Sequence, residues 1–320
     1  MSSVPNSVAE AVQELLTAVE REYNVRIALA VARGSHAWGA AGPDSDYDVG
    51  AVFVPADLRT YAHLEGPVEV VHEDGGSIVD SGGDDGGPEI ELQGWDVHTF
   101  ARLLADSNDG AINLLRSPIR YRTAFDPDAL RAYLESTYNP MDLYHAWRGI
   151  ATSNYRKYVS HHLVDGDARL YPILEVREDA YVVETPGSAG PTTVAADDER
   201  YTETQTKPTV KRNLTIIRAA MSARYLKATG ERGDHDLPAL AFARFLTEQA
   251  PAVFDDDRIE RARELLERKR RGEGAVDVGD AVGREFAHPP REIDPAVHAR
   301  GGPDPTRLDD FVDELIAAAQ

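Results

Sequence analysis

Two aspartates one residue apart, Asp46 and Asp48, are the residues whose type and spacing most directly suggest chemistry. They begin the apolar segment "DYDVGAVFV", which predicts a buried strand over 47–54. Side chains alternate along a strand, so both carboxylates point to one face. Such a pair repels unless a cation lies between them, and Mg²⁺ takes a few protein oxygens and completes its shell with water and phosphate. The pair therefore predicts a metal site that also holds a nucleoside triphosphate (NTP).

Gly34 and Ser35 supply a complementary element ahead of this pair. They follow "VRIALAVA", 25–32, which is short, rich in Val and Ile, and predicts another buried strand. A glycine lets the backbone approach a phosphate closely, while the Ser35 hydroxyl and the amides of a short helix within 36–42 can donate to phosphate oxygens. The segment between the two strands therefore predicts a phosphate-binding turn.

The composition limits which metals and partners fit. The 320 residues include no cysteine, so any metal must be held by oxygen or imidazole, which favours Mg²⁺ or Mn²⁺. A net charge of -21 opposes a polyanionic partner, but the few lysines among many arginines and the acidic loops resemble proteins of halophilic, salt-accumulating cells. Salt there shortens the reach of net charge, so nucleic acid is not excluded. The absence of a membrane-spanning segment and of a signal-peptide pattern predicts a cytoplasmic protein without a membrane partner.

The pattern of the whole chain predicts an α+β protein in two parts. The first, residues 1–122, has a helix over 7–22, strands over 25–32, 47–54, 67–73 and 89–95, a loop over 81–88 and a helix over 97–107. The second, residues 123–320, is mainly helical, with a strand-pair insertion expected near 168–206. Its helices are predicted over 139–163, 207–230, 236–249, 256–272 and 305–319.

The segment "GSHAWGAAGPDSDYD" resembles nucleotidyltransferases of the DNA polymerase beta superfamily, whose hallmark is Gly-Ser, about ten residues, and Asp-x-Asp. With "EIELQGWDVHTFARLL", "SNDGAINLLRSPIRY" and the distal "VKRNLTIIRAAMSARYLKA", it is similar to the RlaP-like family associated with RNA repair. The resemblance implies a polymerase-beta-like mixed sheet with flanking helices, followed by a mainly helical domain.

The resemblance also implies roles for particular residues. Gly34 and Ser35, with Ser45, would hold the triphosphate, while Asp46 and Asp48 would bind metal. Glu91, at the place of the family's strand aspartate, would be the third carboxylate, and it would either take the proton from the attacking hydroxyl or complete the second of two metal sites. The sequence departs from the family pattern at Glu91 itself, at His98 and Thr99, where Arg-Lys is common, and at Asn113, where Glu is common.

For several residues the sequence supports both a functional and a structural interpretation. Asp96 competes with Glu91 but precedes a helix, which favours a cap, and Glu89 shares a strand face with Glu91. Lys211 and Arg218, seven apart on one predicted helix, share a face, so one of them could meet the triphosphate or an RNA backbone; ordinary pairing with acids is equally open.

Other charged or aromatic groups favour structural roles. A second acid pair, "DGD" at 165–167, is interpreted as a solvated loop, "ERKRR" at 267–271 as a solvated helix end, and "DHD" at 234–236 as a helix-entry loop. His161, His162 and Trp38 are interpreted as packing or surface residues.

The sequence therefore predicts metal-dependent transfer of a nucleoside monophosphate from an NTP to a hydroxyl, with an RNA end as the acceptor favoured by the resemblance. Two alternatives stay open. The acceptor could be a protein, as in toxin-antitoxin systems, or a small molecule. The domain could also bind nucleotide without turnover, as a regulator.

Overall fold

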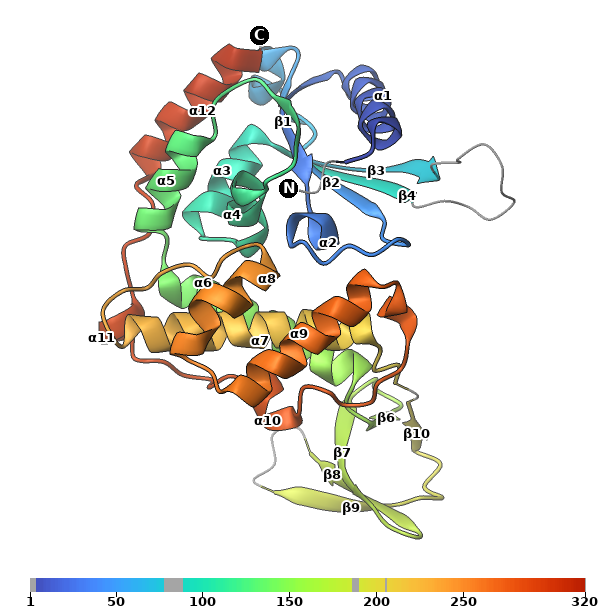
Figure 1. Ribbon diagram of the computed structural model, residues 1–320. Helices are drawn as coiled ribbons and strands as arrows, with labels where there is room; N and C mark the ends of the chain where they lie inside the picture. The colour runs from blue at the N-terminus through green and yellow to red at the C-terminus, as the bar shows by residue number, and fades with distance from the viewer. Residues whose placement is uncertain (1–3, 78–88, 186–189, 205, 320) are drawn as a thin grey trace.

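The computed structural model describes residues 4–77, 89–185, 190–204 and 206–319, and its first part is built on a mixed five-stranded sheet (Figure 1). The strand order is β3-β4-β2-β1-β5, with β2 and β4 parallel and the other neighbours antiparallel. The strands are β1 (Val25–Ala32), β2 (Tyr47–Pro55), β3 (Val70–Ser77), β4 (Glu89–Asp96) and β5 (Arg120–Thr123).

The strand predictions for 25–32, 47–54 and 89–95 are confirmed. The strand predicted at 67–73 begins later, at Val70, and continues to Ser77. The loop predicted at 81–88 lies outside the described residues.

Each face of this sheet packs against its own set of helices. On one face Val49, Ala51 and Phe53 contact α1 (Asn6–Glu22), as the apolar spacing of 7–22 predicts. On the other face Val52 and Val54 join a core with α3 (Val97–Ala105) and α4 (Asp109–Arg116). Because side chains alternate along β2, Asp48 lies on the same face as Val52 and Val54, at the end of the strand where that core stops.

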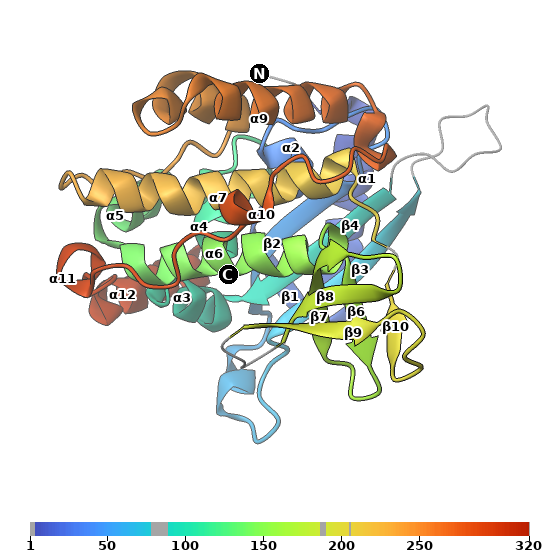
Figure 2. The ribbon, with the colours of Figure 1, turned by 90° about the horizontal axis from the view of Figure 1, so that it is seen from below.

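In the C-terminal part, the long helices α6 (Pro140–Tyr158), α7 (Val210–Gly230) and α9 (Asp256–Arg270) form a layer beneath the first sheet (Figures 1 and 2). Its central helix, α7, is buried on nearly all sides and packs between α6 and α9. The helices of this part are α5 (Asp128–Thr137), α6 (Pro140–Tyr158), α7 (Val210–Gly230), α8 (Phe242–Arg244), α9 (Asp256–Arg270), α10 (Arg284–Ala287), α11 (Pro295–His298) and α12 (Pro305–Ala319). Further helical turns of this part are η2 (Phe245–Gln249), η3 (Ala250–Ala252) and η4 (Glu273–Ala275), while η1 (Leu58–Ala62) lies between β2 and β3 in the first part. None of the described helices has both the length and the apolar composition needed to cross a membrane.

The helix predicted over 236–249 is wrong in its first half, since helical structure begins only at Phe242. Pro238 lacks the N–H that a helix interior requires. The Gln249 side chain instead accepts from the Ala239 N–H at 2.7 Å and donates to the Leu237 carbonyl at 3.2 Å, which holds the segment as a loop.

A second sheet follows α6, where the sequence predicted a strand pair near 168–206 (Figure 2). Five short strands are present instead, in the order β10-β6-β7-β8-β9. Their bounds are β6 (His162–Asp165), β7 (Leu170–Val176), β8 (Ala180–Glu184), β9 (Pro191–Ala195) and β10 (Tyr201–Glu203). The last two strands are largely exposed and polar, so they carry no apolar pattern that would reveal them.

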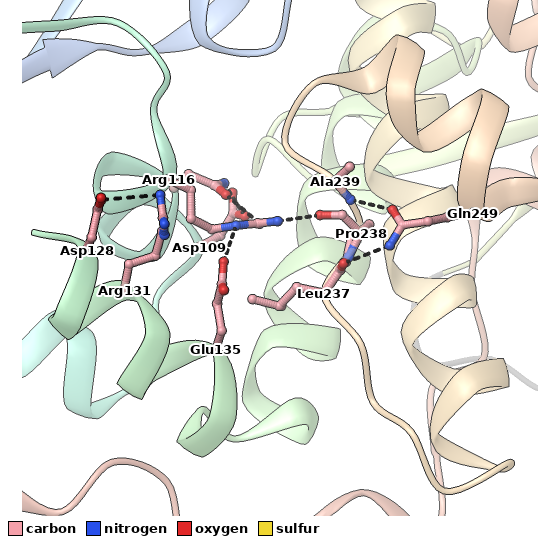
Figure 3. Close-up of polar contacts among 10 residues, drawn as sticks. Asp109, Arg116, Asp128, Arg131, Glu135, Leu237, Pro238, Ala239 and Gln249 are labelled. Carbon is pink, nitrogen blue, oxygen red and sulfur yellow. Dashed lines mark hydrogen bonds and ion pairs between the residues drawn. The ribbon is translucent and has the colours of Figure 1, made fainter.

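The two parts of the chain are tied together at several places. Helix α12 returns to the first sheet, where Phe311 and Leu315 join the core of β1 and α3. Arg116 of α4 donates to the Pro238 carbonyl at 2.7 Å and pairs with Glu135 of α5 at 3.4 Å (Figure 3). These contacts fix how the helical layer lies against the sheet, while the boundary at residue 122 stays a prediction.

Buried histidines make the stability of this fold depend on pH. His235 contacts His298 at 3.1 Å between ring nitrogens, and its other nitrogen receives the Arg300 guanidinium at 3.1 Å, which requires a neutral ring. Burial lowers the pKa of His235 and of His298, and likewise that of His36 and of His288. The folded chain therefore binds fewer protons than the unfolded chain just below the ordinary histidine pKa.

We expect the free energy of unfolding to fall as the pH drops below about 6.5, because protons then bind the unfolded chain preferentially. Urea unfolding at a series of pH values measures this slope. His235→Gln should reduce the slope, and a free energy that is flat through this range in the unmodified protein would contradict the prediction.

Candidate active site

A cleft of about 870 Å³ lies between α2 (Gly34–Ala37) and the start of β2 on one side and the ends of α6, α7 and α9 on the other. It brings together all but one of the residues that the sequence analysis assigned to the site. Those that line it are Gly34, Ser35, Ser45, Asp46, Asp48, Glu91 and Lys211; Arg218 does not.

The carboxylates are placed by the parallel pairing of β2 and β4. Asp48 is the register partner of Glu91, so these two side chains stand on adjacent strands on the same face. Asp46 lies two residues earlier, just before β2 begins at Tyr47. Burial raises the pKa of Asp48, and Arg33 and Lys211 act against this shift.

The donor set consists of oxygens, which suits a hard cation. Within the described residues no three carboxylate or imidazole groups converge closely enough to hold a metal ion by themselves. A cation bound at these carboxylates would need further ligands from water or phosphate, which Mg²⁺ commonly takes.

Gly34 allows Asp48 to reach its position. Its φ is +54°, and a Cβ there would lie 1.9 Å from Asp48 Oδ2. The Arg33 N–H donates to the Asp48 carbonyl at 2.7 Å, which fixes the two backbones together. The sequence analysis predicts that phosphate approaches the backbone of Gly34 closely. In the structure the carboxylate of Asp48 also does so. Gly34 and Ser35 moreover lie inside the short helix, which was predicted to begin after them.

Ser45 is held by a residue that the sequence analysis missed. Its hydroxyl, in a side chain only 6% exposed, accepts from Lys269 Nζ at 2.7 Å and from the Gly42 N–H at 2.9 Å. Burial lowers the pKa of Lys269, and nearby Lys211 adds to the shift while Asp46 opposes it.

The interpretation of 267–271 as a solvated helix end is therefore wrong for Lys269. Its neighbours do pair at the surface, Arg268 with Glu273 and Arg270 with Glu267. The missed signal was helical spacing, because Lys269 continues the buried face of Ile259, Ala262 and Leu266.

The positions of the lysines are a second signal for the site that the sequence analysis did not use. Four of the five lysines in the sequence, Lys157, Lys207, Lys211 and Lys269, line the cleft. None of the four forms an ion pair among the described residues, whereas Lys227, outside the cleft, pairs with Glu231. An acidic chain that uses arginine almost everywhere else thus gathers at one place lysines that form no ion pair with the described acids.

Arg218 lies behind the cleft wall. Its guanidinium is 3.7 Å from the centre of the Trp38 ring, its Nε is buried without a partner, and burial lowers its pKa. Trp38 lines the cleft but also packs on the core around α7, in keeping with its packing interpretation.

The remaining candidate residues have structural roles or lie outside the cleft. Asp96 is buried and caps α3, accepting from the His98 N–H at 2.9 Å and the Tyr61 hydroxyl at 2.6 Å, so the cap interpretation is confirmed. Glu89 is exposed on β4 and does not line the cleft. Asn113 donates to Asp109 at 2.6 Å.

The other structural interpretations agree with the fold, except that 234–236 lies in the loop after α7 and does not lead directly into a helix. Asp165 accepts from the Asp167 and Arg169 N–H groups in the turn after β6. His162 is buried at the start of β6, and His235 belongs to the histidine pair described above.

Comparison with known proteins adds two findings. The model of the family described as "RlaP: RNA repair pathway DNA polymerase beta family" matches residues 8–315. "Uncharacterized protein YcgL" of Bacillus subtilis (strain 168) is 30% identical over 145 residues, which are 45% of this chain and 51% of that protein. The chain thus spans about half the length of this curated relative.

Proposed function

Because the chain belongs to the RNA repair pathway DNA polymerase beta family, we propose that it transfers a nucleoside monophosphate from an NTP to a hydroxyl at an RNA end, with Mg²⁺ or Mn²⁺. Family membership indicates a polymerase-beta-like nucleotidyltransferase in RNA repair. The parts that we propose beyond this are the use of a metal ion, the NTP as donor and the RNA hydroxyl as acceptor.

The arrangement of charged groups in the cleft is the observation that supports this proposal. Asp46, Asp48 and Glu91 line the same cleft as Lys211 and Lys269, two lysines that lie beside the carboxylates and form no ion pair among the described residues. Carboxylates facing unpaired ammonium groups suit a substrate that combines a hard cation with several phosphates.

The residues of the chain suggest how the reaction proceeds. Asp46, Asp48 and Glu91 would hold the metal, which when bound neutralises phosphate charge and polarises the reacting oxygens. Lys211 lies close enough to Asp48 to influence its pKa, so it is placed to attract phosphates bound beside the carboxylates. Lys269 and the Ser35 hydroxyl add further donors.

The placement of these residues suggests which bonds form and which break in the proposed reaction. The acceptor oxygen attacks the α-phosphorus of the NTP, the bond from that phosphorus to the bridging oxygen breaks, and pyrophosphate leaves. Glu91 is the exposed member of the three carboxylates and is placed to accept the proton of the attacking hydroxyl.

The acceptor is identified by offering the purified protein NTPs labelled at the α-phosphate together with RNA, protein and metabolite pools. We expect Mg²⁺-dependent labelling of RNA, abolished by EDTA and restored by added metal. Labelling of a protein band or a small molecule would replace RNA as the acceptor, and nucleotide binding without pyrophosphate release would contradict the proposed activity.

A further inference from the structure

The cations of the cleft fall into two groups. Lys211 and Lys269 lie beside the carboxylates, since Lys211 influences the pKa of Asp48 and Asp46 influences that of Lys269. Lys157 and Arg212 instead lie around Tyr158, whose pKa they lower, Lys157 having the larger effect. A triphosphate held at the carboxylates therefore leaves the second group without an anion.

Lys207 extends the second group. It lines the same cleft and lies just ahead of Thr209, the residue that caps α7. Lys157 is in the last turn of α6, and Arg212 is in the first turn of α7. The start of α7 and the end of α6 thus present three cations on one wall.

These three cations have no acidic partner among the described residues. Elsewhere in the chain exposed arginines pair with acids near in sequence, such as Arg200 with Asp198 and Arg244 with Glu248. In a chain with 55 acidic residues, cleft cations that pair with none of the described acids are available to an anionic ligand.

Arg212 is also held in a fixed orientation. Its guanidinium lies 3.8 Å from the centre of the Tyr158 ring, and Lys157 Nζ lies 5.0 Å from the same ring centre. A planar guanidinium resting on an aromatic ring keeps its N–H edge directed outward, where it can bind two phosphate oxygens at once.

From this arrangement we infer that Lys157, Lys207 and Arg212 form a second anion site that binds backbone phosphates of the RNA acceptor. The inference rests on the proposed function for the identity of the acceptor. A single-stranded RNA suits the site because its phosphates repeat along the strand, and a fixed guanidinium recognises phosphate by two hydrogen bonds. The site would position the RNA end beside the carboxylates.

The test uses binding, which needs no catalysis. A fluorescein-labelled oligouridylate is titrated with the full chain over a series of KCl concentrations, and its dissociation constant is followed by anisotropy. For the K157Q/R212Q double variant we expect binding about tenfold weaker and a salt slope smaller by about 1.4, which is about 0.7 for each phosphate that the variant no longer neutralises.

Arg156→Gln is the matched control. Arg156 shares the last turn of α6 with Lys157, and its substitution removes the same charge, but it lines a separate pocket beside Arg284 and His288. We expect this variant to keep both the dissociation constant and the salt slope close to those of the unmodified protein. ATP binding should be the same in all three proteins, which also shows that the variants are folded.

Three results would overturn the inference: no RNA binding by the unmodified protein, an unchanged salt slope in the double variant, or equally effective competition by polyglutamate. If the double variant does not fold, Lys157→Gln alone, at an exposed position, should remove about half of the slope change. A reduced slope in the double variant, together with no nucleotide transfer by the unmodified protein, would reject the proposed function and keep the second site.

Discussion

Asp48→Asn is expected to lower the rate of nucleotide transfer by roughly 10³-fold, because the amide keeps the shape of the side chain but loses the charge that attracts a cation. Asp48 is the central carboxylate of the cleft, opposite Glu91 in the sheet and two residues from Asp46. The measurement is the rate of pyrophosphate release at saturating NTP, compared with that of the unmodified protein.

Asp167→Asn provides the control for this variant. Asp167 lies in the Asp-x-Asp segment at 165–167, in an exposed turn of the second sheet, and its substitution removes the same charge without touching the cleft. We expect the turnover of this variant to equal that of the unmodified protein. Near-normal turnover in Asp48→Asn would remove Asp48 from the mechanism.

Gly34→Ala is expected to lower turnover by roughly 10²-fold, since displacing a reacting group by about 1 Å has an effect of this size. The added Cβ would lie 1.9 Å from Asp48 Oδ2, and also 2.9 Å from Cγ and 3.4 Å from Cβ of the same residue. Rotation of the carboxylate alone does not relieve this overlap, so the side chain or the backbone must move.

The same substitution also places an alanine at positive φ, which destabilises the fold by about 1–2 kcal/mol. Gly39→Ala separates the two effects, because its φ is +68° but its Cβ would meet only Arg270, at 3.7 Å. Both variants should lose stability in urea unfolding, Gly34→Ala more than Gly39→Ala because of its overlap with Asp48, and only Gly34→Ala should lose turnover. Equal turnover in the two variants would show that the approach of Gly34 to Asp48 has no catalytic consequence.

Local spacing, together with the family resemblance, was sufficient to predict the residues on the carboxylate side of the cleft. Asp46 and Asp48 could be placed because alternation along a strand is a local property, and Glu91 could be placed because the resemblance put it on a neighbouring strand. The register that sets Asp48 opposite Glu91 agrees with both inferences.

The opposite wall depends on contacts that no local pattern encodes. Lys269 meets Ser45 across 224 positions of sequence, and the pairing exists only because α9 packs against the buried helix α7. Arg218 shows the limit of a helix-face argument. It lies about 10 Å along α7 from Lys211, and over that distance the shared face passes from the cleft into the core, where Arg218 meets Trp38.

The most direct test of the central claim compares ATP labelled at the α-phosphate with ATP labelled at the γ-phosphate, each with RNA and Mg²⁺. We predict that the label of the α-phosphate appears on RNA and that the label of the γ-phosphate appears only in pyrophosphate. The amounts of labelled RNA and of labelled pyrophosphate should be equal. Label on RNA from the γ-phosphate, or no label on RNA from either, would contradict this prediction.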